Sequence, residues 1–189
     1  MVWPFRPKPS SALAKLRGAE WTCADCEMPH VGMFDLAAFA PGPWIGAEEC
    51  EPNSAIRLDG DFLSEDFCVL GGEAFFVRCV LEIPVHGLEE KFGYGCWGSL
   101  KRENFEIYLD HFDTGTVPEN APFWSWLYNS LRPYDMTEPL GCMMFPQAQR
   151  QRPVLKVEPC DHPLFAAQEE GITPEELFGI YAAHGHSVA

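Results

Sequence analysis

The sequence predicts an α+β protein with a mainly antiparallel sheet flanked by a few helices. Three observations lead to this fold class. Apolar and polar residues alternate through the centre of the chain, as in half-buried strands, and helical periodicity with capping signals occurs on either side. Strands and helices do not alternate strictly, as they would in a parallel β-α-β fold.

The chain of 189 residues divides into an N-terminal arm, residues 1–20, and a single α+β domain, residues 21–189. The arm is basic and contains three prolines, which favour an extended start, and residues 11–17 can form one or two helical turns. Because the whole chain has a formal net charge of −15, we expect the basic arm to lie on the acidic body.

The first part of the domain is expected to contain little regular structure. Residues 21–23 predict a short strand that leads into a cysteine-containing turn. The segment 34–52 is rich in Pro, Gly and Ala and predicts an irregular connection, which Phe39 and Trp44 are expected to pin to the core.

A tight hairpin is expected where Gly71 and Gly72 separate the strand 67–70 from a strand that begins at residue 74, because paired glycines supply the positive φ of such turns. Charged residues fall on one face of the second strand. Its opposite, buried face is expected to consist of Phe75, Val77, Cys79, Leu81, Ile83 and Val85.

A return strand is expected over residues 92–99, in which Gly93 and Gly95 allow Trp97 or a neighbouring chain to approach the sheet closely. Two shorter strands are expected near residues 142–145 and 153–157.

Helices are expected at residues 101–112 and 163–170, whereas the apolar run 122–131 is compatible with either strand or helix. The C-terminal helix has the strongest signal, because Thr173 and Glu176 form a capping box around a proline. The buried stripe of this helix is expected to contain Leu177, Ile180, Tyr181 and His184.

The most informative motif is a C-x2-C-x3-H run formed by Cys23, Cys26 and His30. Two thiolates on a tight loop and one imidazole supply three ligands of a tetrahedral zinc ion. We expect His162 to be the fourth, because Asp161 or a backbone carbonyl can orient its ring. The other candidates for the fourth position are Cys68, Cys160 and Asp35.

Two other interpretations of this motif stay open. The cysteines can be reduced thiols on a turn beside an exposed histidine. A redox site would require a helix that begins at the motif and lowers the thiol pKa, but the motif follows a strand, and Asp25 and Glu27 flank Cys26.

The composition indicates which classes of partner and which cellular location to expect. A net charge of −15 disfavours nucleic acid and anionic membranes and favours a basic protein partner. No apolar run reaches the length of a membrane-spanning helix, and the N-terminus lacks an apolar signal core, so we expect a cytoplasmic protein. The six cysteines outside the motif are then expected to be thiols that serve as small apolar residues.

Three functional hypotheses follow. The first is a domain with a structural zinc and no enzymatic activity. The second is an acidic interaction module, favoured by the surplus of aromatic residues, among them Phe123, Trp124, Trp126 and Tyr128; self-association is also compatible with this surplus. The third is a hydrolase-like or transferase site near His162, although no nucleophile, phosphate-loop or dinucleotide motif is present.

Several runs together resemble a bacterial family known only as domain of unknown function twenty-one ninety-nine. They are WTCADCEMPH, SEDFCVLGGEAFFVRCVLEIPVHG, GYGCWGSL, FWSWL and QRPVLKVEPCDHPLFAAQEEGITPEEL. The resemblance covers roughly residues 21–178 and implies no particular activity. Members of the family share the C-x2-C-x3-H start and a D-H-P-L run, here residues 161–164. The position after the second cysteine, commonly glycine in the family, is Glu27 here.

Overall fold

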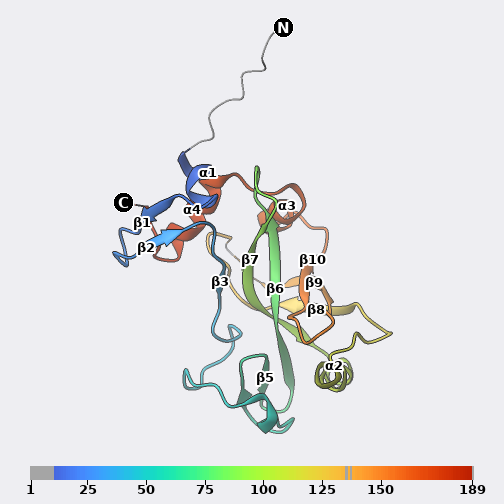
Figure 1. Cartoon of the computed structure of the whole chain (residues 1–189). Helices are drawn as coiled ribbons and strands as arrows, with labels where there is room; N and C mark the ends of the chain where they lie inside the picture. Colours follow the sequence, from blue (N-terminus) through green and yellow to red (C-terminus); the bar gives the residue numbers. More distant parts are fainter. Residues whose placement is uncertain (1–10, 135, 137, 189) are drawn as a thin grey trace.

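The computed structural model describes residues 11–134, 136 and 138–188. The first ten residues of the expected arm, with its three prolines, lie outside this range. The described residues form an α+β fold in which helices flank a mainly antiparallel sheet (Figure 1), so the predicted fold class is confirmed.

The centre of the fold is a closed five-stranded barrel. Neighbouring strands pair antiparallel in chain order, and the last strand pairs parallel with the first, which closes the ring. Closure gives every barrel strand a partner on both sides. The five strands are β6 (Ala74–Pro84), β7 (Lys91–Leu100), β8 (Phe123–Leu127), β9 (Leu140–Phe145) and β10 (Val154–Val157).

The predicted buried face of β6 is confirmed, since all six of its expected residues are at most 3% exposed. The opposite face of β6 is also partly covered, because Phe76 belongs to a second, smaller core. This smaller core consists of Leu63, Cys68, Phe76 and Trp97.

Three short strands extend the sheet beyond the barrel. β5 (Phe67–Leu70) and β4 (Phe62–Leu63) continue it from the first half of β6, and β3 (Leu36–Ala37) pairs parallel with β7. The turn between β5 and β6 is the predicted glycine turn, with φ of 59° at Gly71 and 70° at Gly72.

The expected close approach at Gly93 and Gly95 is confirmed. A Cβ added at Gly93 would lie 2.9 Å from the Asp35 carboxylate, and one added at Gly95 would lie 2.9 Å from the Cβ of Ala37. The glycines therefore make room for β3, a two-residue strand within the segment that we expected to be irregular.

Phe39 does not anchor this segment, because 42% of the residue is exposed. The small residues Ala38 and Ala40 face the smaller core instead, and alternation along the chain then points Phe39 outward. Trp44 is half-buried and does pack against the smaller core, as expected.

The helices agree closely with their sequence signals, and the ambiguous run 122–131 contains the strand β8. Four α-helices occur among the described residues. They are α1 (Ser11–Leu16), α2 (Arg102–Thr114), α3 (Pro163–Glu170) and α4 (Pro174–Ala183), with a 3-10 turn η1 at Asn53–Ala55.

The prediction of a buried stripe on α4 is wrong for one residue. His184 is exposed, because α4 ends at Ala183 and His184 is its C-cap residue, with Nε2 3.1 Å from the carbonyl oxygen of Arg132. Leu177, Ile180 and Tyr181 are buried as predicted. No helix of the described residues is both long and apolar enough to cross a membrane.

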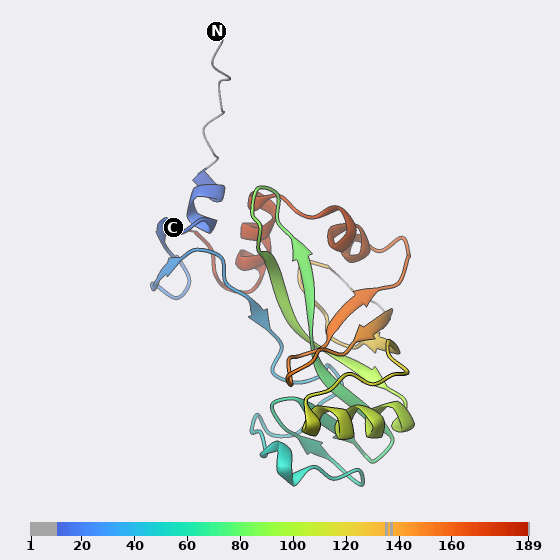
Figure 2. The ribbon, with the colours of Figure 1, turned by 45° about the vertical axis from the view of Figure 1, so that its right-hand side comes forward.

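The remaining elements gather at the two ends of the barrel (Figures 1 and 2). α1, α4 and a separate hairpin of β1 (Glu20–Thr22) and β2 (Pro29–Val31) lie at one end. α2, β4, β5 and η1 lie at the other end. The C-x2-C-x3-H run begins directly after β1 and ends at His30 within β2, so it lies at the α4 end.

The contribution of the α4 capping box to the free energy of unfolding should be measurable. The Thr173 side chain accepts a hydrogen bond from the N–H of Glu176, and the Glu176 carboxylate accepts one from the N–H of Thr173. Thr173→Ala should lower the free energy of unfolding by about 1 kcal/mol, as measured by urea denaturation. Thr173→Ser retains the hydroxyl and should stay close to wild type; equal losses in both variants would contradict the capping role.

Candidate metal centre

The hairpin of β1 and β2 folds the cysteine motif into a tight loop. Trp21 pairs with His30 across the hairpin, and the N–H of Cys23 donates to the carbonyl oxygen of Met28 at 3.0 Å. The N–H of Cys26 points back to Sγ of Cys23 at 3.5 Å. Glu27 completes the turn with φ of 57°, a left-handed conformation that favours glycine.

Four side chains converge at this loop. The ligand atoms of Cys23, Cys26, His30 and His186 all lie within 4.8 Å of one another. Sγ of Cys26 is 3.5 Å from Nε2 of His30, and Sγ of Cys23 is 4.0 Å from Nδ1 of His186. A tetrahedral ion with bonds of about 2.0–2.3 Å separates its ligand atoms by about 3.3–3.8 Å, so the four atoms could hold a metal ion after small adjustments.

His186 reaches the loop because the C-terminal segment is docked onto it. The N–H of Ala24 donates to the carbonyl oxygen of Ser187 at 2.7 Å, and the N–H of Ser187 donates to the Asp25 carboxylate. Cys23 and Val188 form an antiparallel β-bridge. These backbone contacts fix the fourth side chain beside the first cysteine.

The structure does not bring His162 into the group. Its Nδ1 accepts a hydrogen bond from the N–H of Leu164 at 3.2 Å, which makes it the N-cap residue of α3. The three other candidates for the fourth position also lie elsewhere. Cys68 is buried in the smaller core, Cys160 is exposed beyond β10, and Asp35 accepts a hydrogen bond from the N–H of Gly93.

The fourth residue of the cluster could not be found from the local spacing of the motif, because His186 lies 163 residues from Cys23. The sequence does contain one relevant signal, the run His184-Gly185-His186 directly after the last helix. Gly185 has φ of 80°, which turns the chain back after α4. A histidine beyond such a turn becomes a ligand candidate only once α4 is known to pack near the hairpin.

Aromatic rings hold the His30 imidazole in place. The ring of Trp21 stacks on it with centroids 4.7 Å apart, and the ring of Phe34 stacks on it at 4.9 Å. Phe34 in turn stacks on Tyr181 of α4 at 4.2 Å, and the hydroxyl of Tyr181 donates to the Phe34 carbonyl oxygen. The ring is therefore oriented by packing before any ligand binds.

The site has one buried side and one open side. Cys23 is 1% exposed, whereas Cys26 is exposed and both histidines are half-buried. Burial raises the pKa of the Cys23 thiol, but hydrogen bonds from the backbone of Cys26 and Asp25 lower it, and the net pKa lies below the ordinary value. The N–H of Ser187 likewise lowers the pKa of Asp25.

These observations define a class: an α+β protein built on a closed five-stranded barrel, with a Cys2His2 cluster between an N-terminal hairpin and the C-terminal segment. The sequence model of the family described as "Uncharacterized protein conserved in bacteria (DUF2199)" matches residues 22–172, and the chain belongs to this family. The resemblance found in the sequence is thereby confirmed. No curated protein and no solved structure matches the chain.

The residues that match the family include only three of the four residues of the cluster. The matched residues include Cys23, Cys26 and His30 but end before His186. The fourth member of the cluster is thus known from the structure of this chain alone.

The left-handed residue of the turn gives a test of the loop geometry. Glu27→Gly should keep or raise the free energy of unfolding, by up to about 1 kcal/mol, because glycine adopts φ of 57° without steric strain. Glu27→Val should lower it, since a β-branched residue tolerates this conformation poorly. Chemical denaturation of both variants measures the difference, and a valine variant as stable as the glycine variant would contradict this turn.

Proposed function

We propose that this protein is a non-enzymatic domain in which a structural zinc ion is bound by Cys23, Cys26, His30 and His186. The observation that carries the proposal is the convergence of these four ligand atoms within 4.8 Å. Two thiolates and two imidazoles are a common ligand set for structural zinc. His186 takes the position that we had expected for His162.

The number of protein ligands supports a structural role. A catalytic zinc site keeps one coordination position for water or substrate, whereas four protein ligands close the tetrahedron. The pKa of Cys23, which lies below its ordinary value, favours the thiolate form that binds metal.

The position of the cluster indicates what the metal would do. The β1–β2 hairpin is a two-stranded sheet separate from the barrel sheet, and a two-stranded hairpin alone is marginally stable. A shared metal would join this hairpin to the C-terminal segment and close a loop of most of the chain. Binding free energy would then appear as folding stability.

Elemental analysis of protein purified without chelator or nickel resin tests the site. We expect about one zinc per chain in the wild type, and its loss in Cys23→Ser and His186→Ala together with a lower melting temperature. His162→Ala is the matched control and should keep the metal. A wild type without metal would sink the proposal, and loss of zinc in His162→Ala but not in His186→Ala would overturn the ligand set.

A second candidate function is the binding of a basic protein partner. The exposed face of β8 and the residue that follows this strand support it: Trp124, Trp126 and Tyr128 are 46%, 43% and 37% exposed, whereas Phe123 lies on the opposite, buried face of β8. The two tryptophan rings meet edge to face with centroids 5.7 Å apart. Exposed aromatic residues are typical of interfaces, and the net charge of −15 favours a cationic partner.

Titration calorimetry with a synthetic arginine-rich peptide tests this second function. Trp124→Ser combined with Trp126→Ser should weaken binding about tenfold, as expected for interface tryptophans, and added salt should weaken binding to the wild type. Phe39→Ser removes an exposed aromatic residue outside β8 and should leave the affinity unchanged. Equal affinity of all three proteins, or no salt dependence, would refute this function.

Self-association is a separate proposal for the same aromatic face. Analytical ultracentrifugation of the wild type and of the double tryptophan variant tests it. A wild-type dimer that dissociates in the variant would support it, and a monomeric wild type would refute it.

The hydrolase-like alternative at His162 is weakened by the role of this residue as the N-cap of α3. Its Nδ1 is used as an acceptor at the start of α3. A general base would need that nitrogen, or the other one, directed at a nucleophile.

A further inference from the structure

The two cysteines of the cluster differ in their access to solvent. Cys26 is exposed, whereas Cys23 is 1% exposed and belongs to the main core. Their sulfur atoms are neighbours, because all ligand atoms of the cluster lie within 4.8 Å of one another. Oxidation-sensitive cysteines are typically accessible thiolates with a second cysteine close by that can complete a disulfide. Cys26 and Cys23 have this arrangement.

Backbone hydrogen bonds hold the loop that carries both sulfur atoms. The N–H of Cys26 points to Sγ of Cys23 at 3.5 Å, and the N–H of Cys23 donates to the carbonyl oxygen of Met28. Between the two cysteines, the N–H of Ala24 donates to Ser187 of the C-terminal segment, which lies beside the hairpin in Figure 1. The bonds from Cys23 and Ala24 involve no sulfur atom, so the loop keeps the two sulfurs close whether they bind a metal or each other.

Zinc binding and disulfide formation are mutually exclusive uses of these two sulfur atoms. A tetrahedral zinc ion with Zn–S bonds of about 2.3 Å keeps its sulfur ligands about 3.8 Å apart and holds them as thiolates without help from a helix. A disulfide brings the sulfurs to about 2.05 Å and leaves no thiolate. Only His30 and His186 would then remain for the ion. Because a structural zinc site uses four protein ligands, the oxidised loop would lose the metal.

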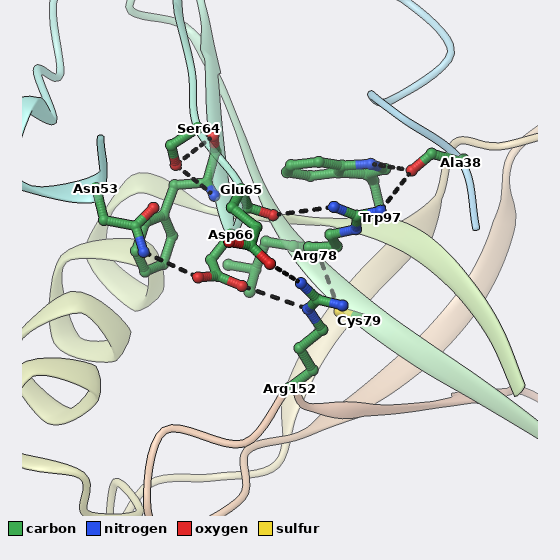
Figure 3. Close-up of polar contacts among 11 residues, drawn as sticks. Ala38, Asn53, Ser64, Glu65, Asp66, Arg78, Cys79, Trp97 and Arg152 are labelled. Carbon is green, nitrogen blue, oxygen red and sulfur yellow. Dashed lines mark hydrogen bonds and ion pairs between the residues drawn. The ribbon is translucent and has the colours of Figure 1, made fainter. Parts of the chain in front are cut away.

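Four of the other six cysteines are closed to solvent. They are Cys68, Cys79, Cys96 and Cys142. Cys79 and Cys96 are directly opposite each other on β6 and β7, but both are completely buried. Sγ of Cys79, which is labelled in Figure 3, donates to the carbonyl oxygen of Val77, and burial raises the pKa of this thiol to about 12. The folded barrel thus shields this second pair of thiols from an oxidant in solution.

On the basis of the zinc site proposed above, we propose that Cys26 and Cys23 are a peroxide-sensitive thiol pair whose oxidation releases the metal. The Cys26 thiolate attacks hydrogen peroxide; an S–O bond forms, the O–O bond breaks and hydroxide leaves, so that Cys26 becomes a sulfenic acid. The Cys23 thiolate then attacks this sulfur; the S–S bond forms, the S–O bond breaks and a second hydroxide leaves. The two sulfurs together give two electrons to the peroxide, and zinc leaves as Zn²⁺, which is not redox-active.

Treatment of the zinc-loaded full chain with a small excess of hydrogen peroxide tests the proposal. We expect about one zinc per chain to be released to a colorimetric chelator, with the loss of about two free thiols and a Cys23–Cys26 disulfide in the peptide mass map. A dithiol reductant with added zinc should restore the bound metal, because the disulfide is reducible. The double variant Cys50→Ser, Cys160→Ser lacks the other two exposed thiols and should release zinc as the wild type does.

Cys26→His retains four nitrogen or sulfur ligands but removes the accessible thiol, so it should keep its zinc under the same treatment. If this variant binds no zinc, the peptide map of the wild type and the recovery by reductant decide alone. A wild type without zinc before oxidation refutes the zinc site, and this proposal with it. The redox proposal alone is overturned if the wild type starts with zinc and keeps it in peroxide. It is also overturned if release needs Cys50 or Cys160, or if Cys26 forms a sulfinic or sulfonic acid and no disulfide.

Discussion

The antiparallel pairing of β6 with β7 is the interaction on which the other elements depend. It runs without interruption from Phe75 opposite Leu100 to Pro84 opposite Lys91. On its other edge, β6 pairs with β5 in its first half and with β10 at Val80. β7 pairs with β3 near Tyr94 and with β8 near Gly98. Two long strands, each shared between two neighbours, thus join the barrel to the outer strands.

A line of aromatic rings connects the cysteine cluster to this pair of strands. His30 stacks on Phe34, Phe34 stacks on Tyr181, and Tyr181 meets Phe92 of β7 edge to face at 5.9 Å. Phe92 and Tyr94 then contact each other within the main core. The cluster therefore rests on packed rings that reach the barrel, and its geometry depends on the position of α4.

The sequence predicted those features that depend on neighbouring residues. The glycine turn at Gly71, the alternation along β6 and the capping box at Thr173 all act over a few residues, and each is found in the structure. Three ligands of the candidate site were likewise within one short run. His186 was missed because only the packing of α4 against the hairpin brings it to Cys23. The outward turn of Phe39 was missed because it depends on which alanines face Trp97.

The outer strands also bear on how this chain avoids aggregation. An exposed sheet edge can recruit another chain through its unpaired backbone groups, and long regular edges do so most readily. Here the barrel closes on itself, and the strands at the two ends of the sheet order, β3 and β4, contain two residues each. Edges of this length give an incoming strand few hydrogen bonds. The long and strongly apolar strands β6 and β7 are thereby kept inside the sheet, where they cannot act as a template.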